Sequence, residues 1–322
     1  MTYRALLNRT TRALTLASLT LAGSAAFAQQ PLRLILGYPP GGSNDVVARL
    51  IAPHLGTELG VTVIIENKAG ANGTVAASYV AKAAPDGNTL FLVSSSPLAI
   101  APHVIKVPFD TNKDFAAINQ IGYTPEAIGV YPGLGIDSLA GLLERAKTTD
   151  VRISSSGNGG LPHLTIELLK EATKGRIIHV PYKGGGPAVS DAMAGHVEAV
   201  VMDLSALQGQ FKAGKLKAVA VTTEKRDPLL PDVPSAAELG YPSVNAANWI
   251  GVFAPAKTPE ATVAKLHAAI AKVVARPEVQ RQLQDNGLNP ATLPTPAAFQ
   301  QFVANDFTRW GKVVKAAGVT AE

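Results

Sequence analysis

Short apolar runs alternate with helical patterns over most of the chain, and this alternation constrains the fold more than any other feature. Near-continuous apolar runs are typical of strands that are buried on both faces. The candidate strands are Leu32–Leu36, Val61–Glu66, Thr89–Val93, Val151–Ser154, Ile177–Val180, Ala199–Met202 and Leu216–Val221. The helical patterns between them are Asp45–Leu59, Thr74–Ala83, Leu164–Ala172, Pro187–Ala194 and Ala206–Ala213. This order predicts an α/β protein with mainly parallel sheets.

One unit of strand, glycine-rich turn, helix, strand and second turn occurs twice. The first copy has the turns Gly41-Gly42 and "NKAGANG", and the second has "SSGNGG" and "PYKGGG". Two such units predict two α/β lobes of similar build. Helical patterns follow, from about Pro259 through Gln284 and from Pro296 to about Lys315. Because ligands of open parallel sheets bind beyond the carboxyl ends of the strands, we expect the turns of both lobes to surround one cleft.

The first 28 residues have the pattern of a secretory signal peptide. Arg4, Arg9 and Arg12 precede the apolar run of residues 13–26, and "AFA" at residues 26–28 is an A-x-A cleavage site. The run is too short for a membrane span of about 20 residues. We therefore expect cleavage near Ala28 and a soluble, exported mature protein of residues 29–322.

Composition excludes several classes of protein. The leader carries three Arg and no acidic residue, so removing it lowers the formal charge from +5 to +2. No dense basic cluster is present, so we expect no nucleic-acid partner. The chain has no Cys, which excludes a disulfide scaffold, a thiolate metal site and a lipid-modified Cys anchor. A mature chain of this length buries a large core and usually divides into two domains.

Turns that are mostly rich in Gly and Ser follow predicted strands and lead into helices or end near one. Such turns let the backbone approach a ligand closely, and the helix N-terminus that follows favours negative charge. Each turn alone is also compatible with a plain strand–helix connection, with Ser43, Asp45 or Thr74 as an N-cap. Together the turns predict a polar, backbone-lined site for a carboxylate. The turns are "YPPGGSND", "AGANGT", "SSSPLAI", "SSSGNGGLPH", "YKGGGPA" and "VMDLS".

No catalytic or metal motif is present. A G-x-S-x-G elbow is missing, the stretch 209–216 ends in Leu where a P-loop needs Ser or Thr, and Pro162 stands where a dinucleotide fingerprint needs Gly. The six His have no metal-ligand spacing. We therefore predict no catalytic residue, no metal and no cofactor. An exported hydrolase or transferase remains an alternative, with Ser155 and His163 as its best candidate pair.

Three side chains near the turns have readings that do not involve catalysis. His163 either donates to a ligand or braces its loop. His179 lies in a predicted strand and reads as a satisfied core residue. Lys183, beside three glycines, is either a cation for a carboxylate or a solvated loop residue.

The motifs taken together resemble the Bug-type (TctC-like) solute receptors of tripartite tricarboxylate transporters. They are "GYPPGGSNDVVAR", "ENKAGANGTVAA", "APDGNTL", "HVPYKGGGPAVSDAMAGHVEAVVMD", "GKLKAVAVTTEKRDPLLPDVPSAAELGYP" and "WIGVFAPAKTPE", and the resemblance runs from about Pro31 to the C-terminus. It implies a type II periplasmic-binding-protein fold with two α/β lobes and a hinged cleft. It also implies a periplasmic receptor, not an enzyme, that captures a small carboxylate and delivers it to a membrane permease.

The resemblance also implies how the chain divides. Lobe 1 is expected to contain residues 29–125 and 251–322, and lobe 2 residues 126–250. The crossings between lobes are expected near Tyr123–Tyr131 and Asn245–Phe253. We expect a monomer with a permease partner. A receptor domain that signals to a membrane sensor is a further alternative that the sequence does not separate from transport.

Family ligands are held largely by backbone groups, hydroxyls and ordered water. Carried onto this sequence, the contacts fall on 40–43, 73–74 and 94–96 in lobe 1, and on 155–160, 184–186 and Asp203 in lobe 2. The predicted ligand-binding residues are Tyr38, Pro40, Gly41, Gly42, Ser43, Asn44, Gly73, Thr74, Ser94, Ser95, Ser96, Ser155, Asn158, Gly159, Gly160, His163, Tyr182, Gly185, Gly186 and Asp203.

Two features bear on the choice of ligand. Relatives often have a small residue or Thr where this chain has Asn44, whose amide offers both a donor and an acceptor. Tyr38, Tyr182 and Trp249 either line the cleft, which would favour an aromatic acid by stacking, or pack the lobes. Aliphatic and aromatic mono- and dicarboxylates are therefore both open at this point.

Overall fold

The computed structural model describes residues 30–320, so the predicted signal peptide and its cleavage site lie outside the described residues. The strands are β1 (Leu32–Leu36), β2 (Val63–Asn67), β3 (Thr89–Ser94), β4 (Phe115–Val130), β5 (Val151–Ser155), β6 (Ile177–Pro181), β7 (Ala199–Asp203), β8 (Lys217–Val221), β9 (Ala247–Pro255) and β10 (Asn289–Pro290). All seven predicted strands are present, within one or two residues of their expected bounds.

The helices follow the predicted order with some additions. They are α2 (Ser43–Leu59), α3 (Thr74–Ala81), α4 (Ala101–Val104), α5 (Leu139–Thr148), α6 (Leu161–Thr173), α7 (Gly185–Met193), α8 (Leu204–Lys212), α9 (Glu260–Val274), α10 (Pro277–Asp285) and α11 (Pro296–Ala317), with short helical turns at η2 (Ala71–Gly73), η3 (Ser96–Ile100) and η4 (Pro132–Leu134). The predicted helical stretch 259–284 is two helices, because Pro277 begins α10 and cannot continue α9. Helix α5 was not predicted; the Ser138 hydroxyl caps it by accepting from the Gly141 N–H.

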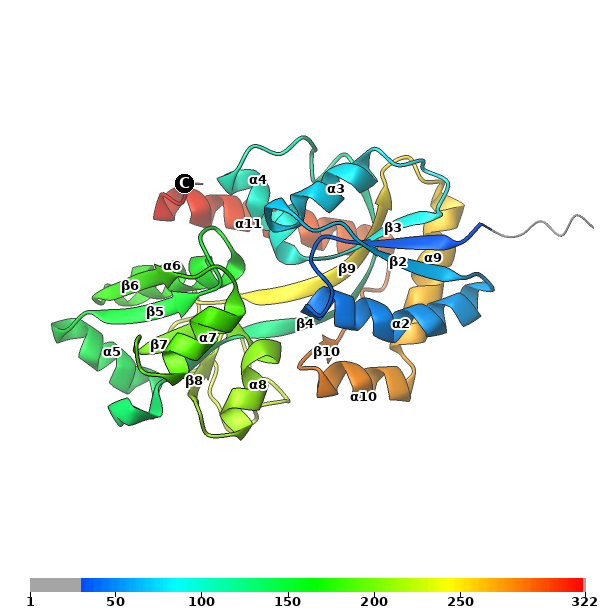
Figure 1. The fold of residues 1–322 in the computed structure, drawn as a ribbon. Helices are drawn as coiled ribbons and strands as arrows, with labels where there is room; N and C mark the ends of the chain where they lie inside the picture. The colour runs from blue at the N-terminus through cyan, green and yellow to red at the C-terminus, as the bar shows by residue number, and fades with distance from the viewer. Residues whose placement is uncertain (1–29, 321–322) are drawn as a thin grey trace, which may run out of the picture. The chain divides into compact units, whose positions relative to one another are not determined.

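The strands form one sheet in the order β2-β1-β3-β9-β4-β7-β5-β6, and β8 and β10 also pair with β4. At one end β1 pairs in parallel with β2 and β3, and at the other β5 pairs in parallel with β6 and β7. The expectation of parallel sheets is confirmed for these two groups. Between them, β4 and β9 are antiparallel to each other and to their neighbours, as Figure 1 shows.

The two antiparallel strands carry the predicted crossing segments. Residues 123–131 lie on β4 and its end, and residues 245–253 lie mostly on β9. The sequence does not read as a strand over β4 because buried polar side chains interrupt its apolar run, among them Asn119, Gln120, Thr124 and Glu126. These two strands are the continuous connection between the two parallel groups, while the lobe bounds given above stay a prediction.

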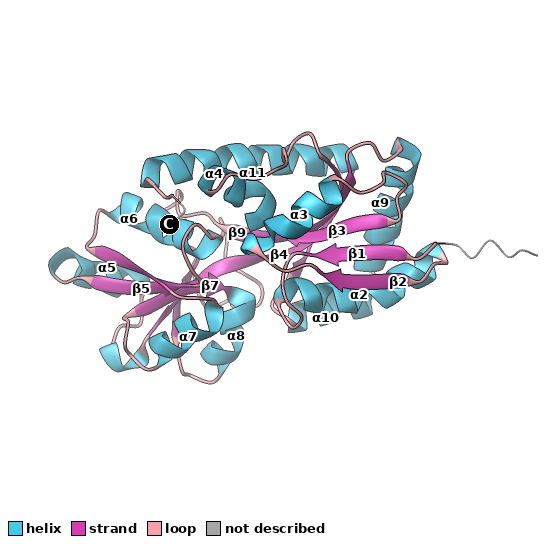
Figure 2. Cartoon of the chain, turned by 45° about the horizontal axis from the view of Figure 1, so that its top comes forward, coloured by secondary structure: helices cyan, strands magenta, loops and turns pink. Residues whose placement is uncertain are grey.

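Helices cover both faces of the sheet, as Figure 2 shows. Around β1 and β3, one core packs against α2, α9 and α10, and a second packs against α3, η3 and α11. Around β5 and β7, one core packs against α5 and α6, and another packs against α7 and α8. Because apolar cores fix both ends of the sheet, the carboxyl ends of β1, β3, β5 and β7 are held in place.

An aromatic cluster packs β9 against α11. The indole of Trp249 contacts Phe253, Phe299 and Phe302, and its Nε1 donates to Asp306 Oδ2 at 2.8 Å. Gly251 makes room for Phe299, because a Cβ at Gly251 would lie 2.3 Å from the Phe299 ring. A glycine in this strand is therefore a packing requirement.

The turn between β1 and α2 is held by the buried carboxylate of Asp45. Asp45 accepts from the Gly41 N–H at 3.0 Å, from Asn67 Nδ2 at 3.1 Å and from the Arg49 guanidinium at 2.8 and 3.0 Å. Hydrogen bonds from Arg49, with those from Gly41 and Asn67, lower the pKa of Asp45 to about 2. Gly41 has a φ of +88°, which a side chain would strain. The carboxylate and this glycine together set the path of the turn.

Replacement of Gly251 by Ala is expected to destabilise the protein. The new methyl group displaces the buried Phe299 ring, and overpacking of this kind costs about 1–3 kcal/mol in the free energy of unfolding. Urea unfolding followed by circular dichroism measures the change. Gly209→Ala is the control, because Gly209 lies in α8 with no atom within 4 Å of a new Cβ, and Ala there raises helix propensity. Equal stability of the two variants would contradict this packing.

Asp45→Asn is expected to lower the free energy of unfolding by about 2 kcal/mol at neutral pH. The two carboxylate oxygens of Asp45 accept from several donors, whereas an amide has only one acceptor oxygen. The folded-state pKa lies below its unfolded value, so the stabilisation is complete above about pH 4 and is lost as the pH falls through about 2. Urea unfolding at pH 7 and at pH 3 measures the difference.

Asp86→Asn is the matched control, because the exposed Asp86 accepts one backbone N–H that an amide oxygen also accepts. A gap between Asp45→Asn and the natural protein that does not shrink at low pH would rule out this account of the turn.

Candidate functional site

A cleft of about 510 Å³ opens where the carboxyl ends of β1, β3, β5 and β7 meet. Its walls come from turns that are far apart in the sequence. The lining residues are Tyr38, Pro39, Pro40, Gly42, Ser43, Asn44, Asn72, Ser94, Ser96, Ser156, Gly160, Leu161, Pro162, Gly184, Gly185, Met202, Asp203 and Asn248. Turns from both groups of strands therefore converge on one cleft, as the sequence predicted.

Four helices begin at the cleft. The residues before α2, α6, α7 and α8 are Gly42, Gly160, Gly184 and Asp203; all four line the cleft, and none caps its helix with a side chain. The first turn of each helix leaves N–H groups without partners in the helix, and the helix dipole places partial positive charge there. No Lys, Arg or His is among the residues that line the cleft. The positive electrostatic potential that an anion experiences in this cleft therefore comes mainly from backbone N–H groups.

Hydroxyl and amide groups complete the lining. Ser43, Ser94, Ser96 and Ser156 each lie on it. Asn44 is 4% exposed, and its side-chain nitrogen, Nδ2, has no hydrogen-bond partner. A buried donor without a partner is costly, so an acceptor from a ligand or from water is the expected partner of this nitrogen.

Asp203 and Asn248 link the two ends of the sheet at the floor of the cleft. Asn248 Nδ2 donates to Asp203 Oδ2 at 3.0 Å, and Asn248 Oδ1 accepts from the Ser95 backbone N–H at 3.2 Å and from its hydroxyl at 3.0 Å. Burial raises the pKa of Asp203, and burial also raises the pKa of Tyr38 to about 12, so Tyr38 is a neutral phenol. β9 thereby positions side chains that arrive from β3 and β7.

The predicted residues divide into two groups by position. Those that line the cleft are Tyr38, Pro40, Gly42, Ser43, Asn44, Ser94, Ser96, Gly160, Gly185 and Asp203. Those that lie behind the lining or elsewhere are Gly41, Gly73, Thr74, Ser95, Ser155, Asn158, Gly159, His163, Tyr182 and Gly186.

Most members of the second group make internal hydrogen bonds that hold the turns. Gly41 donates to Asp45, Thr74 Oγ1 donates to Ala71 O at 2.8 Å, and the Tyr182 hydroxyl donates to Asp191 Oδ2 at 2.5 Å. Asn158 and Gly159 line a separate cavity of about 350 Å³ beside α4. These groups therefore support the cleft from behind or face away from it.

Ser155 and His163 do not form the pair that a hydrolase would need. The Ser155 hydroxyl lies 2.6 Å from His179 Nε2, whereas His163 Nδ1 accepts from the Gly159 N–H at 3.0 Å. His163 therefore braces its loop, the second of its two readings. His179 is only partly buried and stacks on His163 at 3.8 Å, which corrects its reading as a core residue. Burial and the neighbouring His163 lower the pKa of His179 to about 4.

Lys183 and the aromatic candidates also fall outside the lining. Lys183 is exposed and does not line the cleft. Trp249 is 2% exposed and belongs to the aromatic cluster with α11, while Tyr182 is bound to Asp191. Tyr38 alone of the three proposed aromatic residues lines the cleft.

Several lining residues were not singled out from the sequence. Pro39, Asn72 and Met202 lie inside quoted motifs, and Leu161 and Pro162 directly follow a predicted glycine, so sequence position alone was a usable signal for them. Asn248 had no such signal, because it lies near the start of β9, outside every glycine-rich turn, and reaches the cleft only through strand pairing.

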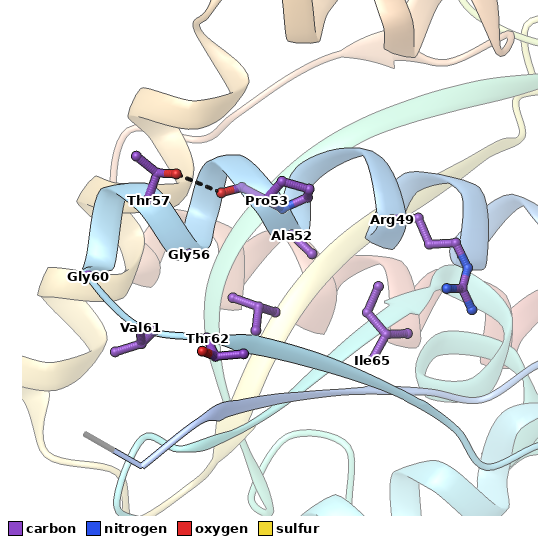
Figure 3. Close-up of a pocket in the computed structure, with 10 residues that line it drawn as sticks. Arg49, Ala52, Pro53, Gly56, Thr57, Gly60, Val61, Thr62 and Ile65 are labelled. Carbon is purple, nitrogen blue, oxygen red and sulfur yellow. Dashed lines mark hydrogen bonds between the residues drawn. The ribbon is translucent and has the colours of Figure 1, made fainter. Parts of the chain in front are cut away.

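A wider groove of about 720 Å³ lies between α2 and β2, and Figure 3 shows it. Two of its three polar side chains, those of Thr57 and Arg49, are already engaged. Thr57 Oγ1 donates to Pro53 O at 3.0 Å, and Arg49 is bound to Asp45. None of the residues before α2, α6, α7 and α8 lines this groove, so the cleft at the strand ends is the candidate site.

No helix between residues 30 and 320 combines the length and the apolar composition that a membrane span requires. Residues 47–319 match the family described as "Tripartite tricarboxylate transporter family receptor". The protein BugT of Bordetella pertussis is 34% identical over 293 residues, which cover 90% of each chain.

Solved structures agree with this match. R. palustris Rpa4515 with adipate has a TM-score of 0.82 and 32% identity, over 92% of this chain and all of that one. MatC from Rhodopseudomonas palustris with bound malate has a TM-score of 0.76 and 30% identity, over 89% of this chain and all of that one. The fold is that of the two-lobed periplasmic binding proteins. The chain belongs to the tripartite tricarboxylate transporter receptor family, whose members are substrate-binding receptors and not enzymes.

Proposed function

We propose that this protein is a periplasmic receptor that captures a small dicarboxylate in the cleft and delivers it to the permease of a tripartite tricarboxylate transporter. The observation that carries the proposal is the meeting of four helix N-termini, none capped by its own N-cap side chain, at a cleft whose lining residues include no cationic side chain. Of the four, α8 already donates one first-turn N–H, that of Ser205, to Thr124 Oγ1 at 3.3 Å. Such a site favours an anion that accepts hydrogen bonds from backbone N–H groups.

Two carboxylates fit this arrangement better than one. Helix α2 reaches the cleft from the β1–β3 group, while α6, α7 and α8 reach it from the β5–β7 group. A ligand with a carboxylate at each end therefore receives N–H donors from both sides. The adipate and malate bound to Rpa4515 and MatC are dicarboxylates, which supports this choice.

An aliphatic ligand is favoured over an aromatic one. Stacking needs an exposed ring face, and Trp249 and Tyr182 do not line the cleft. The volume of about 510 Å³ lies within the usual range for small-molecule sites. Tyr38 offers one ring and a neutral hydroxyl, which donates to Asn72 O at 3.4 Å and to Asn72 Oδ1 at 3.3 Å. The hydroxyl would have to leave these long contacts to donate to a ligand, and it adds no charge to the cleft.

Delivery follows from closure of the two lobes on the ligand. β4 and β9 are the strands that connect the two groups, so bending within them changes the width of the cleft. We propose that the signal peptide directs the receptor to the periplasm. There the receptor acts as a monomer, and the permease binds its closed form.

Malate or adipate at about 100 times its dissociation constant is expected to stabilise the protein by about 2.7 kcal/mol, which raises Tm by several degrees. Gly185→Val is expected to abolish this shift, because its Cβ would lie 2.7 Å from Met202 Cε and fill the cleft. Thermal melts with malate, adipate and phthalate measure both effects.

Gly186→Val is the matched control, because Gly186 lies in the same turn of α7, does not line the cleft, and has no atom within 4 Å of a new Cβ. It is expected to keep the ligand-induced shift. No shift with any carboxylate would count against the proposed function, and a shift with phthalate alone would overturn the aliphatic choice.

A further inference from the structure

Glu126 is a buried carboxyl group that the cleft description leaves unexplained. It lies on β4 with 0% exposure, and neither carboxyl oxygen accepts a hydrogen bond from an N–H or hydroxyl group. In the antiparallel pairing of β4 with β7, Glu126 stands opposite Asp203. Buried acids are normally paired with a donor or a cation, so the arrangement needs a physical reason.

The neighbouring carboxyl supplies that reason. Directly opposite residues of an antiparallel pair project from the same face of the sheet, so the Glu126 side chain lies beside that of Asp203. Asp203 lines the cleft and accepts from Asn248. Two ionised carboxylates repel each other and neither has a proton to donate, so a hydrogen bond between them requires one proton. Burial first, and then the charge of Asp203, raises the pKa of Glu126 well above its ordinary value.

We propose that Glu126 and Asp203 share one proton in the empty receptor, and that capture of a dicarboxylate dianion beside Asp203 draws a second proton from solvent onto the pair. The empty pair then carries one negative charge and the loaded pair carries none. This coupling of proton and ligand rests on the proposed function.

Between residues 30 and 320, no other group near the pair takes up that charge. From the turn after β1, Tyr38 faces Asp203 as a neutral phenol. From β9, Asn248 donates to Asp203, and after β8, Thr222 donates to the backbone carbonyl of Glu126; neither side chain titrates. No Lys, Arg or His lines the cleft. A proton is therefore the available counter-charge when a dianion arrives.

The direction of the effect follows from linkage. A bound dianion raises the pKa of the shared pair, so binding takes up protons and affinity increases as the pH falls. From about pH 8.5 down to about pH 6.5, the carboxyls of malate and adipate stay ionised and contribute little to this change. Uptake of one full proton corresponds to about tenfold in Kd per pH unit.

Isothermal titration calorimetry of the full-length mature receptor with malate and with adipate tests the coupling. The number of protons taken up follows from the difference in heat between phosphate and Tris buffers. The natural protein is expected to take up a proton, in whole or in part, and to bind more weakly as the pH rises. Asp203→Asn removes the charge, so proton uptake is expected to vanish and affinity at high pH to equal or exceed that of the natural protein.

Glu126→Gln keeps the size and a donor to Asp203 but leaves Asp203 as the single acid of the pair, so proton uptake and the gain in affinity at low pH are both expected to shrink. If this variant does not fold, Asp203→Asn alone decides. Glu198→Gln is the control, because Glu198 pairs with Arg152 and does not line the cleft. Proton uptake by the Glu198→Gln variant is expected to equal that of the natural protein.

Two negative results are distinguishable. Binding without net proton uptake, or a pH profile that Asp203→Asn leaves unchanged, overturns the coupling while the proposed function stands. Absence of binding for both ligands contradicts the proposed function and the coupling together.

Discussion

The antiparallel pairing of β4 with β9 joins the two parallel groups of strands into one sheet. Without it, the carboxyl ends of β1 and β3 would have no fixed relation to those of β5 and β7. The pairing also places Asn248 between Ser95 and Asp203, so one strand aligns turns that come from both groups. The aromatic cluster around Trp249 then holds β9 against α11. The geometry of the cleft depends on this central pair of strands.

Electrostatics in the cleft comes mainly from the backbone. Lys and Arg are missing from its lining, and four helix N-termini point at it instead. Fixed dipoles of this kind need no reorganisation when an anion arrives, and they leave specificity to neutral groups such as the Asn44 amide and the Ser hydroxyls. The Asp203 carboxyl is the exception, and its pairing with Glu126 gives the cleft a charge that a proton can change.

Local sequence patterns predicted most of the strands and helices, but fewer of the residues that line the cleft. The parallel strands and the glycine-rich turns follow from apolar periodicity and turn chemistry, which are short-range properties. β4 escaped prediction because buried polar side chains interrupt its apolar run, and their burial depends on strands and helices distant in sequence. Ser155 and Tyr182 were expected to touch ligand, yet they bind His179 and Asp191, since a side chain's partner depends on atoms distant in sequence.

By itself, the sequence determined the α/β class and the family, because these follow from residue type and spacing along the chain. The tertiary structure decided which side chains line the cleft and which brace it. It also decided that Glu126 lies against Asp203, 77 positions further along the chain. Strand pairing creates such neighbours, and only the folded backbone sets the burial and distance that fix their charge.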